Sequence, residues 1–327
     1  LILMAHNGME ITFAPVIVNA SQVKTGRNYL AVSKTLFIDE QHSRASWLIA
    51  HDARHHPHGR SYPAPAAVRA VAHCHEHPGS VISGFSALAV YGLPFLVDAA
   101  DTTLHAPVGK HRPASQHAPS VARLRPPHTE TWTLTHRGLH LRVATPERAT
   151  VQALQQLRHD DHSWQIEQVE GLDPVDVRAI QLVDCVRRHL GVTPKGVRDA
   201  AFGQLNARWL SGILARSRDT ADSPKETELR LLLEPIVAKH GVALVEQFPV
   251  VVGGRIITTL DFAIPLLRIG AMFDGHHHWE WEQRQKDSSI NMIALAEGWK
   301  VPRTSAKTMR QCVQTIEALI VDALRQL

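Results

Sequence analysis

The hydrophobic positions in the C-terminal third of the chain recur with a spacing that predicts alternating helices and strands. Apolar residues follow helical spacing in ETELRLLLEPIVAKHG, whereas the next three apolar runs are short and typical of strands. Gly253-Gly254 supplies a turn between the first two runs, and Pro265 separates the second from the third. The predicted order is helix 226–241, strands 242–252, 255–264 and 266–274, helix 281–298, strand 299–303 and helix 305–327.

The pattern is less regular in the first two thirds of the chain. Helical spacing recurs over 65–78, 80–94, 146–157 and 173–202, and alternation predicts strands over 102–108, 121–126, 131–136 and 139–146. Residues 11–18 and 34–40 resemble short strands, and residues 45–56 fit either a helix or a loop. We therefore expect an α/β protein with an N-terminal segment 1–62 of uncertain structure, an α+β domain over 63–215 and a C-terminal domain over 223–327.

Composition narrows the class of protein without deciding its function. The 327 residues are 44% hydrophobic and 20% charged, as in soluble globular proteins, and no apolar run approaches the roughly 20 residues that cross a bilayer. Three scattered cysteines do not form a disulfide framework, so we expect a reducing cytoplasm. The net charge of +4 is compatible with a polyanionic partner but does not require one. We expect translation to begin at Met4 or Met9.

Histidines and tryptophans offer several candidate sites. His73 and His77 in HCHEH are one helical turn apart, a spacing that zinc sites use, but no third ligand is evident and we interpret them as a helix surface. Trp299 follows a glycine in a short strand and is expected to pack in the core. Trp279 and Trp281 lie close to a candidate metal site, described next, and are the candidates for contacting substrate.

Acidic residues stand at the ends of the predicted strands. Asp261 lies within an apolar strand, and Asp274 ends the next one, directly before Gly275. An aspartate inside a strand is costly unless a cation or several hydrogen bonds compensate it, and two acids on adjacent strands can share one hard divalent cation. Glu226 in the preceding helix can add a third oxygen, and the histidines at 276–278 provide a neutral base for activating water.

A purely structural role for these acids is also open. An aspartate before glycine often only makes a turn, and Asp261 can pair with Arg255 or Arg268. The joint order of a helix glutamate, a strand aspartate, a strand-end Asp-Gly and then histidines nevertheless favours metal-assisted chemistry.

The same residues resemble a known enzyme family. Glu226-Thr227, Arg230, Asp261, the FDGHHH run at 273–278, Asp287 and GWKVPR at 298–303 are similar to the very-short-patch-repair endonuclease superfamily, over roughly residues 223–327. The resemblance implies a restriction-endonuclease-like PD-(D/E)XK core with the order α-β-β-β-α-β-α. It also implies a Mg²⁺-dependent (or Mn²⁺-dependent) DNA endonuclease with Asp261 as the central metal ligand and Asp274 as a second. Glu226 takes the place of the family's helix acid, and His278 that of the histidine in its D-G-x-x-H pattern.

Two departures from the family pattern keep a second interpretation open. Met272 stands where many members have a glutamate, and no basic residue follows Asp287 in the usual place, although Lys286 or Arg284 can supply a positive charge. Together with Arg303, Lys286 is a candidate for contacting phosphate. The alternative is an inactive nuclease fold that serves as a nucleic-acid-binding regulator or antitoxin.

Residues 63 to about 200 carry a weaker resemblance. HPGSVISGFSALAVYGLP and VATPERATVQAL are similar to actinobacterial proteins related to abortive-infection type IV antitoxins. This resemblance implies that the N-terminal half recognises substrate or a protein partner, and it places the protein in defence or repair by analogy.

Overall fold

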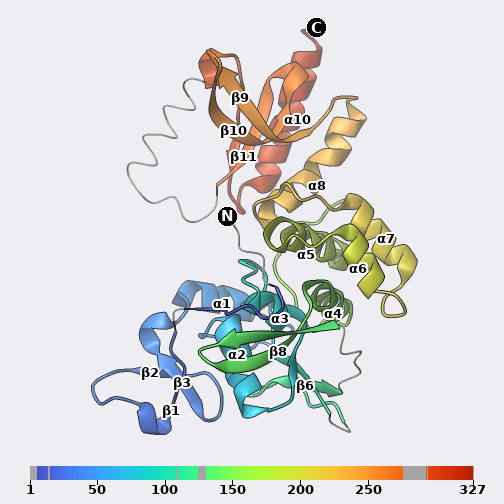
Figure 1. Ribbon diagram of the computed structural model, residues 1–327. Helices are drawn as coiled ribbons and strands as arrows, with labels where there is room; N and C mark the ends of the chain where they lie inside the picture. The colour runs from blue at the N-terminus through green and yellow to red at the C-terminus, as the bar shows by residue number, and fades with distance from the viewer. Residues whose placement is uncertain are drawn as a thin grey trace. The chain divides into compact units, whose positions relative to one another are not determined.

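The protein is a mixed α/β structure made of two compact units. The computed structural model describes residues 6–13, 15–107, 110–123, 130–274, 292 and 294–326. The first unit combines Leu1–Ile166 with Pro174–Arg218, and the second combines Glu167–Asp173 with Asp219–Leu327. Helices and strands occur in both units, as the ribbon in Figure 1 shows.

A five-stranded mixed sheet is the largest sheet of the first unit. Its strands lie in the order β6-β5-β4-β8-β7, with β4 parallel to β8 and β5 parallel to β6. The strands are β4 (Val81–Ile82), β5 (Thr103–Ala106), β6 (Ser120–Arg123), β7 (Thr131–His136) and β8 (Leu139–Ala144). The last four of these correspond to the strands predicted from alternation.

The predicted helix over 80–94 is wrong at its beginning. Val81 and Ile82 form the central strand β4, and the helix α3 (Gly84–Val90) begins only after Ser83. Both β-branched residues are almost fully buried, which suits a strand in the middle of a sheet, and Gly84 adopts φ +55, a conformation outside the helical region. Apolar periodicity alone cannot separate a short buried strand from the first turn of a helix.

The described part of the first unit has six further α-helices, and a small antiparallel sheet precedes all six along the chain. The helices are α1 (Ser46–His55), α2 (Ala66–Glu76), α4 (Pro146–Arg158), α5 (Pro174–Leu190), α6 (Pro194–Ala200) and α7 (Ala207–Arg216). The small sheet has the order β1-β3-β2, with β1 (Val18–Asn19), β2 (Tyr29–Ala31) and β3 (Leu36–Asp39). The strand predicted over 11–18 is therefore wrong except at Val18, and Pro15, which cannot donate to a ladder, lies within that run.

His73 does not lie on the surface of its helix as the HCHEH pattern led us to expect. It lies in α2 with only 2% of its surface exposed, and burial lowers its pKa to about 4. His77 ends the helix, with its imidazole Nδ1 2.9 Å from the carbonyl oxygen of His73. The expected helix surface is therefore wrong for His73, which packing of its helix buries, while His77 stands half-buried at the C-cap.

The described part of the second unit contains a four-stranded sheet and two long helices. The sheet has the order β12-β11-β10-β9, in which β9, β10 and β11 are antiparallel neighbours and β12 runs parallel to β11. The elements are α8 (Pro224–Lys239), β9 (Val245–Val252), β10 (Arg255–Ile264), β11 (Ile269–Phe273), β12 (Arg303–Thr304) and α10 (Met309–Leu324). Gly253 and Gly254 both have positive φ, as the tight turn between β9 and β10 requires.

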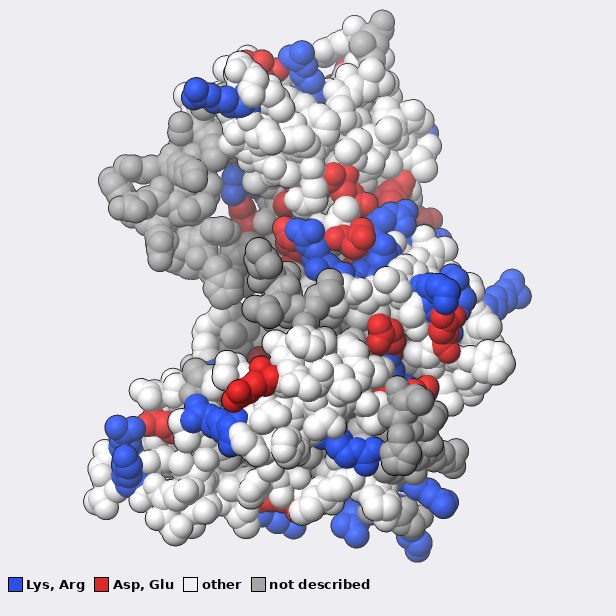
Figure 2. Space-filling model, in the orientation of Figure 1, with Lys and Arg blue, Asp and Glu red and all other residues white. Residues whose placement is uncertain are grey.

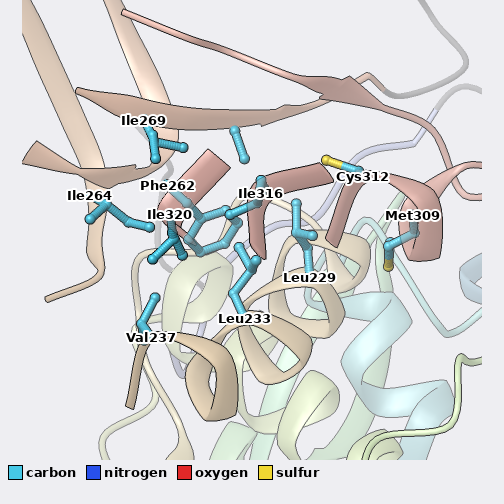
Figure 3. Close-up of a cluster of buried hydrophobic side chains, with 11 residues drawn as sticks. Leu229, Leu233, Val237, Phe262, Ile264, Ile269, Met309, Cys312, Ile316 and Ile320 are labelled. Atoms are coloured by element: carbon cyan, nitrogen blue, oxygen red, sulfur yellow. The ribbon is translucent and has the colours of Figure 1, made fainter. Parts of the chain in front are cut away.

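The core of the second unit lies between α8, α10 and the sheet. Phe262 and Ile264 alternate with polar or small residues along β10 and meet Leu233 of α8 and Ile316 of α10. In Figure 3 these side chains point toward one another from the two helices and the strands. Trp299 packs in a second cluster with a ring-to-ring distance of 5.3 Å to Phe248, which confirms its predicted place in the core.

None of the helices among the described residues is long and apolar enough to cross a bilayer.

Candidate active site

Glu226 is fixed in the first turn of α8 by the residues that cap this helix. Ser223 is the N-cap, and its hydroxyl accepts from the Glu226 amide. The Glu226 carboxylate in turn accepts hydrogen bonds from Ser223 Oγ at 2.8 Å and from the Asp222 amide at 2.9 Å. This reciprocal arrangement follows from the S-x-x-E spacing, so Glu226 has a structural role in addition to any chemical one. Only 7% of its surface is exposed.

Asp261 lies where the pairing between β10 and β11 ends. The last paired residues are Phe262 and Ala271, and beyond them Asp261 Oδ2 accepts a hydrogen bond from the Phe273 amide at 2.6 Å. The carboxylate thus takes the place of a backbone acceptor at the end of the ladder. Arg268, one of the cations considered for pairing with Asp261, instead donates to the carbonyl oxygen of Glu297 at 2.6 Å.

The electrostatics of Glu226 and Asp261 are those of buried acids held close together. Burial, and then the charges of Asp222 and Asp274, raise the pKa of Asp261 to about 6, although the Phe273 amide and Arg303 oppose the rise. Burial, and then the charge of Asp261, raise the pKa of Glu226 to about 7. Neither acid forms an ion pair within the part of the chain that the structure describes.

Asp274 has a different environment, because Arg303 neutralises it. Arg303 Nε lies 3.1 and 3.0 Å from the two carboxylate oxygens of Asp274, and Nη2 lies 2.5 Å from Oδ1. The parallel pairing of β11 with β12 brings the two residues together, and the Asp274 amide also donates to the Thr304 carbonyl at 2.7 Å. Arg303, predicted to contact phosphate, is therefore engaged by a candidate metal ligand.

Three of the four predicted catalytic residues belong to the described part of the second unit. The charge of Asp261 acts on Glu226, and the charge of Asp274 acts on Asp261. The fourth, His278, lies outside the described residues, as do the predicted substrate contacts Trp279, Trp281 and Lys286. Within residues 6–274 and 292–326, apart from the gaps given above, no group of three or more His, Cys, Asp or Glu side chains has the geometry of a metal site.

Asp222 is a participant that the sequence did not single out. It precedes the N-cap of α8, its amide donates to Glu226, and its charge raises the pKa of Asp261. The available signal was its position one residue before the S-x-x-E pattern, in a segment that we interpreted only as a domain boundary.

The donor set of this site fits a hard divalent cation. Carboxylate oxygens are the protein ligands that Mg²⁺ and Ca²⁺ prefer, and Glu226 and Asp261 supply them from a buried environment that penalises unbalanced charge. A bound dication would offset both the burial and the mutual repulsion of these acids. For Asp274 to join them, its carboxylate has to be shared with Arg303 or released from it.

Charged side chains of both signs occur on the face of the molecule that Figure 2 draws. On the face drawn in Figure 2, the described Lys and Arg side chains are mixed with Asp and Glu rather than gathered into a broad basic area. No protein-family model, no curated protein and no solved structure matches this chain. The function is therefore inferred from the residues of the site.

Proposed function

We propose that the chain is a metal-dependent endonuclease that hydrolyses phosphodiester bonds of DNA, and that its second unit has a restriction-endonuclease-like core. The observation that carries the proposal is the pair of buried acids, Glu226 and Asp261, whose pKa values are raised chiefly by burial and which form no ion pair among the described residues. Such a pair is stabilised when a divalent cation binds, and perturbed carboxyl groups of this kind gather at catalytic sites.

The order of elements around these acids supports the same proposal. Among the described residues of the second unit, a capped helix, three antiparallel strands, a parallel strand and a final helix occur in this order. Glu226 stands at the start of the first helix, Asp261 lies in the second strand, and Asp274 follows the third. These are the positions that the resemblance to the very-short-patch-repair superfamily assigns to the acids.

The proposed mechanism gives each side chain a distinct task. Asp261 and Asp274 would hold Mg²⁺ or Mn²⁺, with Glu226 adding an oxygen, and the bound ion would supply Lewis-acid polarisation of the scissile phosphate. Ser223 and the Asp222 amide orient the Glu226 carboxylate, and the Phe273 amide orients that of Asp261. His278 would accept a proton from the attacking water. Arg303 balances the charge of Asp274 and can contact a phosphate oxygen.

An inactive nuclease fold that binds nucleic acid as a regulator or antitoxin is the second candidate. The observation in its favour is the close pairing of Asp274 with Arg303, which satisfies this carboxylate without a metal. Met272, in place of the glutamate that many members of the resembled family carry, points the same way. In either case the first unit would recognise the substrate or a protein partner, in defence or repair.

A nicking assay on supercoiled plasmid separates the two functions. We expect cleavage that requires Mg²⁺ or Mn²⁺ and falls on the order of 100-fold or more in Asp261→Ala, because the removed group is a metal ligand. The matched control is Asp322→Ala, whose side chain is 61% exposed in the same unit and should leave the rate unchanged. Binding of DNA or RNA without cleavage of either would favour the regulator. Full activity of Asp261→Ala would show that the site is misassigned.

A further inference from the structure

A polar pocket of about 290 Å³ belongs to the first unit, whereas the acids discussed above belong to the second. Part of its wall is one face of the adjacent strands β5 and β6. The residues on this face are Thr103, His105, Ser120 and Ala122, which alternate along each strand. Leu104 and Val121 lie between them, point to the opposite face and are 0% and 3% exposed. The strand pair therefore directs its hydrophobic side into the core and its polar side into the pocket.

Helix α4 presents a matching polar stripe to the same pocket. Gln152, Gln156 and His159 are spaced four and three residues apart and so share one face of the helix. Gln152 Oε1 accepts from the Gly84 amide at 3.0 Å, and Gln156 Nε2 donates to Thr103 Oγ1 at 2.9 Å. These bonds fix the stripe in place. The helix and the strand pair therefore both present polar side chains to the pocket.

The nitrogen donors at the pocket favour a negatively charged ligand. Three exposed imidazoles, those of His58, His111 and His159, lie at the pocket together with the guanidinium of Arg60. The half-buried imidazole of His105, whose pKa burial lowers to about 4, adds a neutral hydrogen-bonding group. Of the two acids at the pocket, Asp101 accepts from His56, Arg60 and Tyr62, so its charge and that of Arg60 offset each other. Burial raises the pKa of the other acid, Asp161.

The size and chemistry of the pocket narrow the class of anion. A volume of about 290 Å³ is at the small end for ligand sites. Among the described lining residues none is Phe, Tyr or Trp, so the stacking platform that usually receives a nucleobase is lacking. The imidazoles instead come from several walls, namely the segment around His58, the loop residue His111, the strand residue His105 and His159 at the end of α4, which suits the spread oxygens of a phosphoryl group.

We propose that this pocket binds a phosphate monoester, carried either by a small sugar phosphate or by the 5′ end of a nucleic acid. The site belongs to the first unit alone and does not depend on the endonuclease proposal.

Calorimetric titration of the full chain tests the inference. One pair of probes is ribose 5-phosphate and ribose. The other pair is a thymidine dinucleotide with a 5′-phosphate and the same dinucleotide with a free 5′-hydroxyl. We expect saturable binding of at least one phosphorylated probe and at least 10-fold weaker binding of its unphosphorylated partner. The double variant His58→Gln/His159→Gln should weaken the phosphorylated probe about 10-fold or more. The matched control His75→Gln/His140→Gln removes two exposed imidazoles elsewhere in the unit and should bind as the wild type does.

Comparing phosphorylated with unphosphorylated probes tests the ligand class, and comparing the sugar with the dinucleotide tests the source of the phosphate. Preference for ribose 5-phosphate points to a metabolite, and preference for the phosphorylated dinucleotide points to a nucleic-acid end. Equal binding of phosphorylated and unphosphorylated probes, binding that the His58/His159 variant leaves intact, or no saturable binding of either phosphorylated probe would overturn the proposal. Thermal melting of the variants in parallel shows whether they fold, and because all four imidazoles lie on the surface we expect unchanged melting temperatures.

Discussion

Replacing Asp261 by asparagine should make the metal-free protein more stable at neutral pH. The folded state raises the pKa of this carboxyl from 3.8 to about 6, so the folded chain holds the proton more tightly than the unfolded chain does. Stability is therefore lost as the pH rises from about 4 to about 6, and the loss is complete above that window. At 1.36 kcal/mol per pH unit the rise corresponds to about 3 kcal/mol, which solvent screening reduces to an expected gain of about 1 to 3 kcal/mol for Asp261→Asn.

The comparison has to be made between variant and wild type at each pH. His73, His105 and His162 each have a pKa that burial lowers to about 4, so their contribution to stability grows as the pH rises from about 4 to 6.5. The histidines therefore raise the stability of the wild type over the same pH range in which ionisation of Asp261 lowers it. Measuring the wild type alone would not reveal the contribution of Asp261. Because these histidines are the same in both proteins, they cancel in the difference, which should shrink at pH 4.5 to about a third of its value at pH 8.

Thiol labelling in urea can report on the second unit by itself. Cys312 is buried in the core of that unit, whereas Cys74 and Cys185 are buried in the first, so mass spectrometry of labelled peptides separates the two unfolding reactions. With EDTA present, we expect Cys312 to be labelled at a higher urea concentration in Asp261→Asn than in the wild type. Adding Mg²⁺ should stabilise the wild type but not the variant, because the dication binds only the folded acids.

The control variant Asp274→Asn should behave in the opposite way. It removes the carboxylate that pairs with Arg303 at a site where the aspartate side chain is 37% exposed, so a loss of up to about 1 kcal/mol is expected. The prediction would be refuted if Asp261→Asn were less stable than the wild type at pH 8, or if the difference in stability did not change with pH. Ionisation of the buried Asp261 would then not destabilise the folded protein.

Three further substitutions test the packing of the two units. Leu233 is 1% exposed, so Leu233→Ala leaves a cavity in the core of the second unit and should lower its free energy of unfolding by about 2–5 kcal/mol. Cys312 should then be labelled at a lower urea concentration, with the labelling of Cys74 unchanged. Gly84→Ala places a Cβ at φ +55 and 2.1 Å from Gln156 Oε1, so unit 1 should lose at least about 1 kcal/mol in a Cys74 labelling experiment. Arg69→Met leaves the carbonyls of Ala64, Ala100 and Asp98 without their donor and should cost about 3 kcal/mol by the same measurement, a loss that unchanged labelling would contradict.

Local sequence determined most of the elements of the second unit. The helix α8 follows from its S-x-x-E cap and apolar spacing, the β9–β10 turn from Gly253-Gly254, and the end of β10 from Pro265. Trp299 was likewise expected in the core. These features are encoded within a few residues of one another, so they can be read from the sequence without knowledge of the rest of the chain.

Only the tertiary structure decided what surrounds the acids and the histidines. The pairing of Asp274 with Arg303 depends on β12 lying parallel to β11 across 29 positions of sequence, and the part played by Asp222 depends on how α8 approaches β10. The burial of His73 and the strand at Val81–Ile82 depend on the sheet that packs around them. Charge state and burial are properties of an environment that distant residues build, and hydrophobic periodicity carries no record of which distant residues these are.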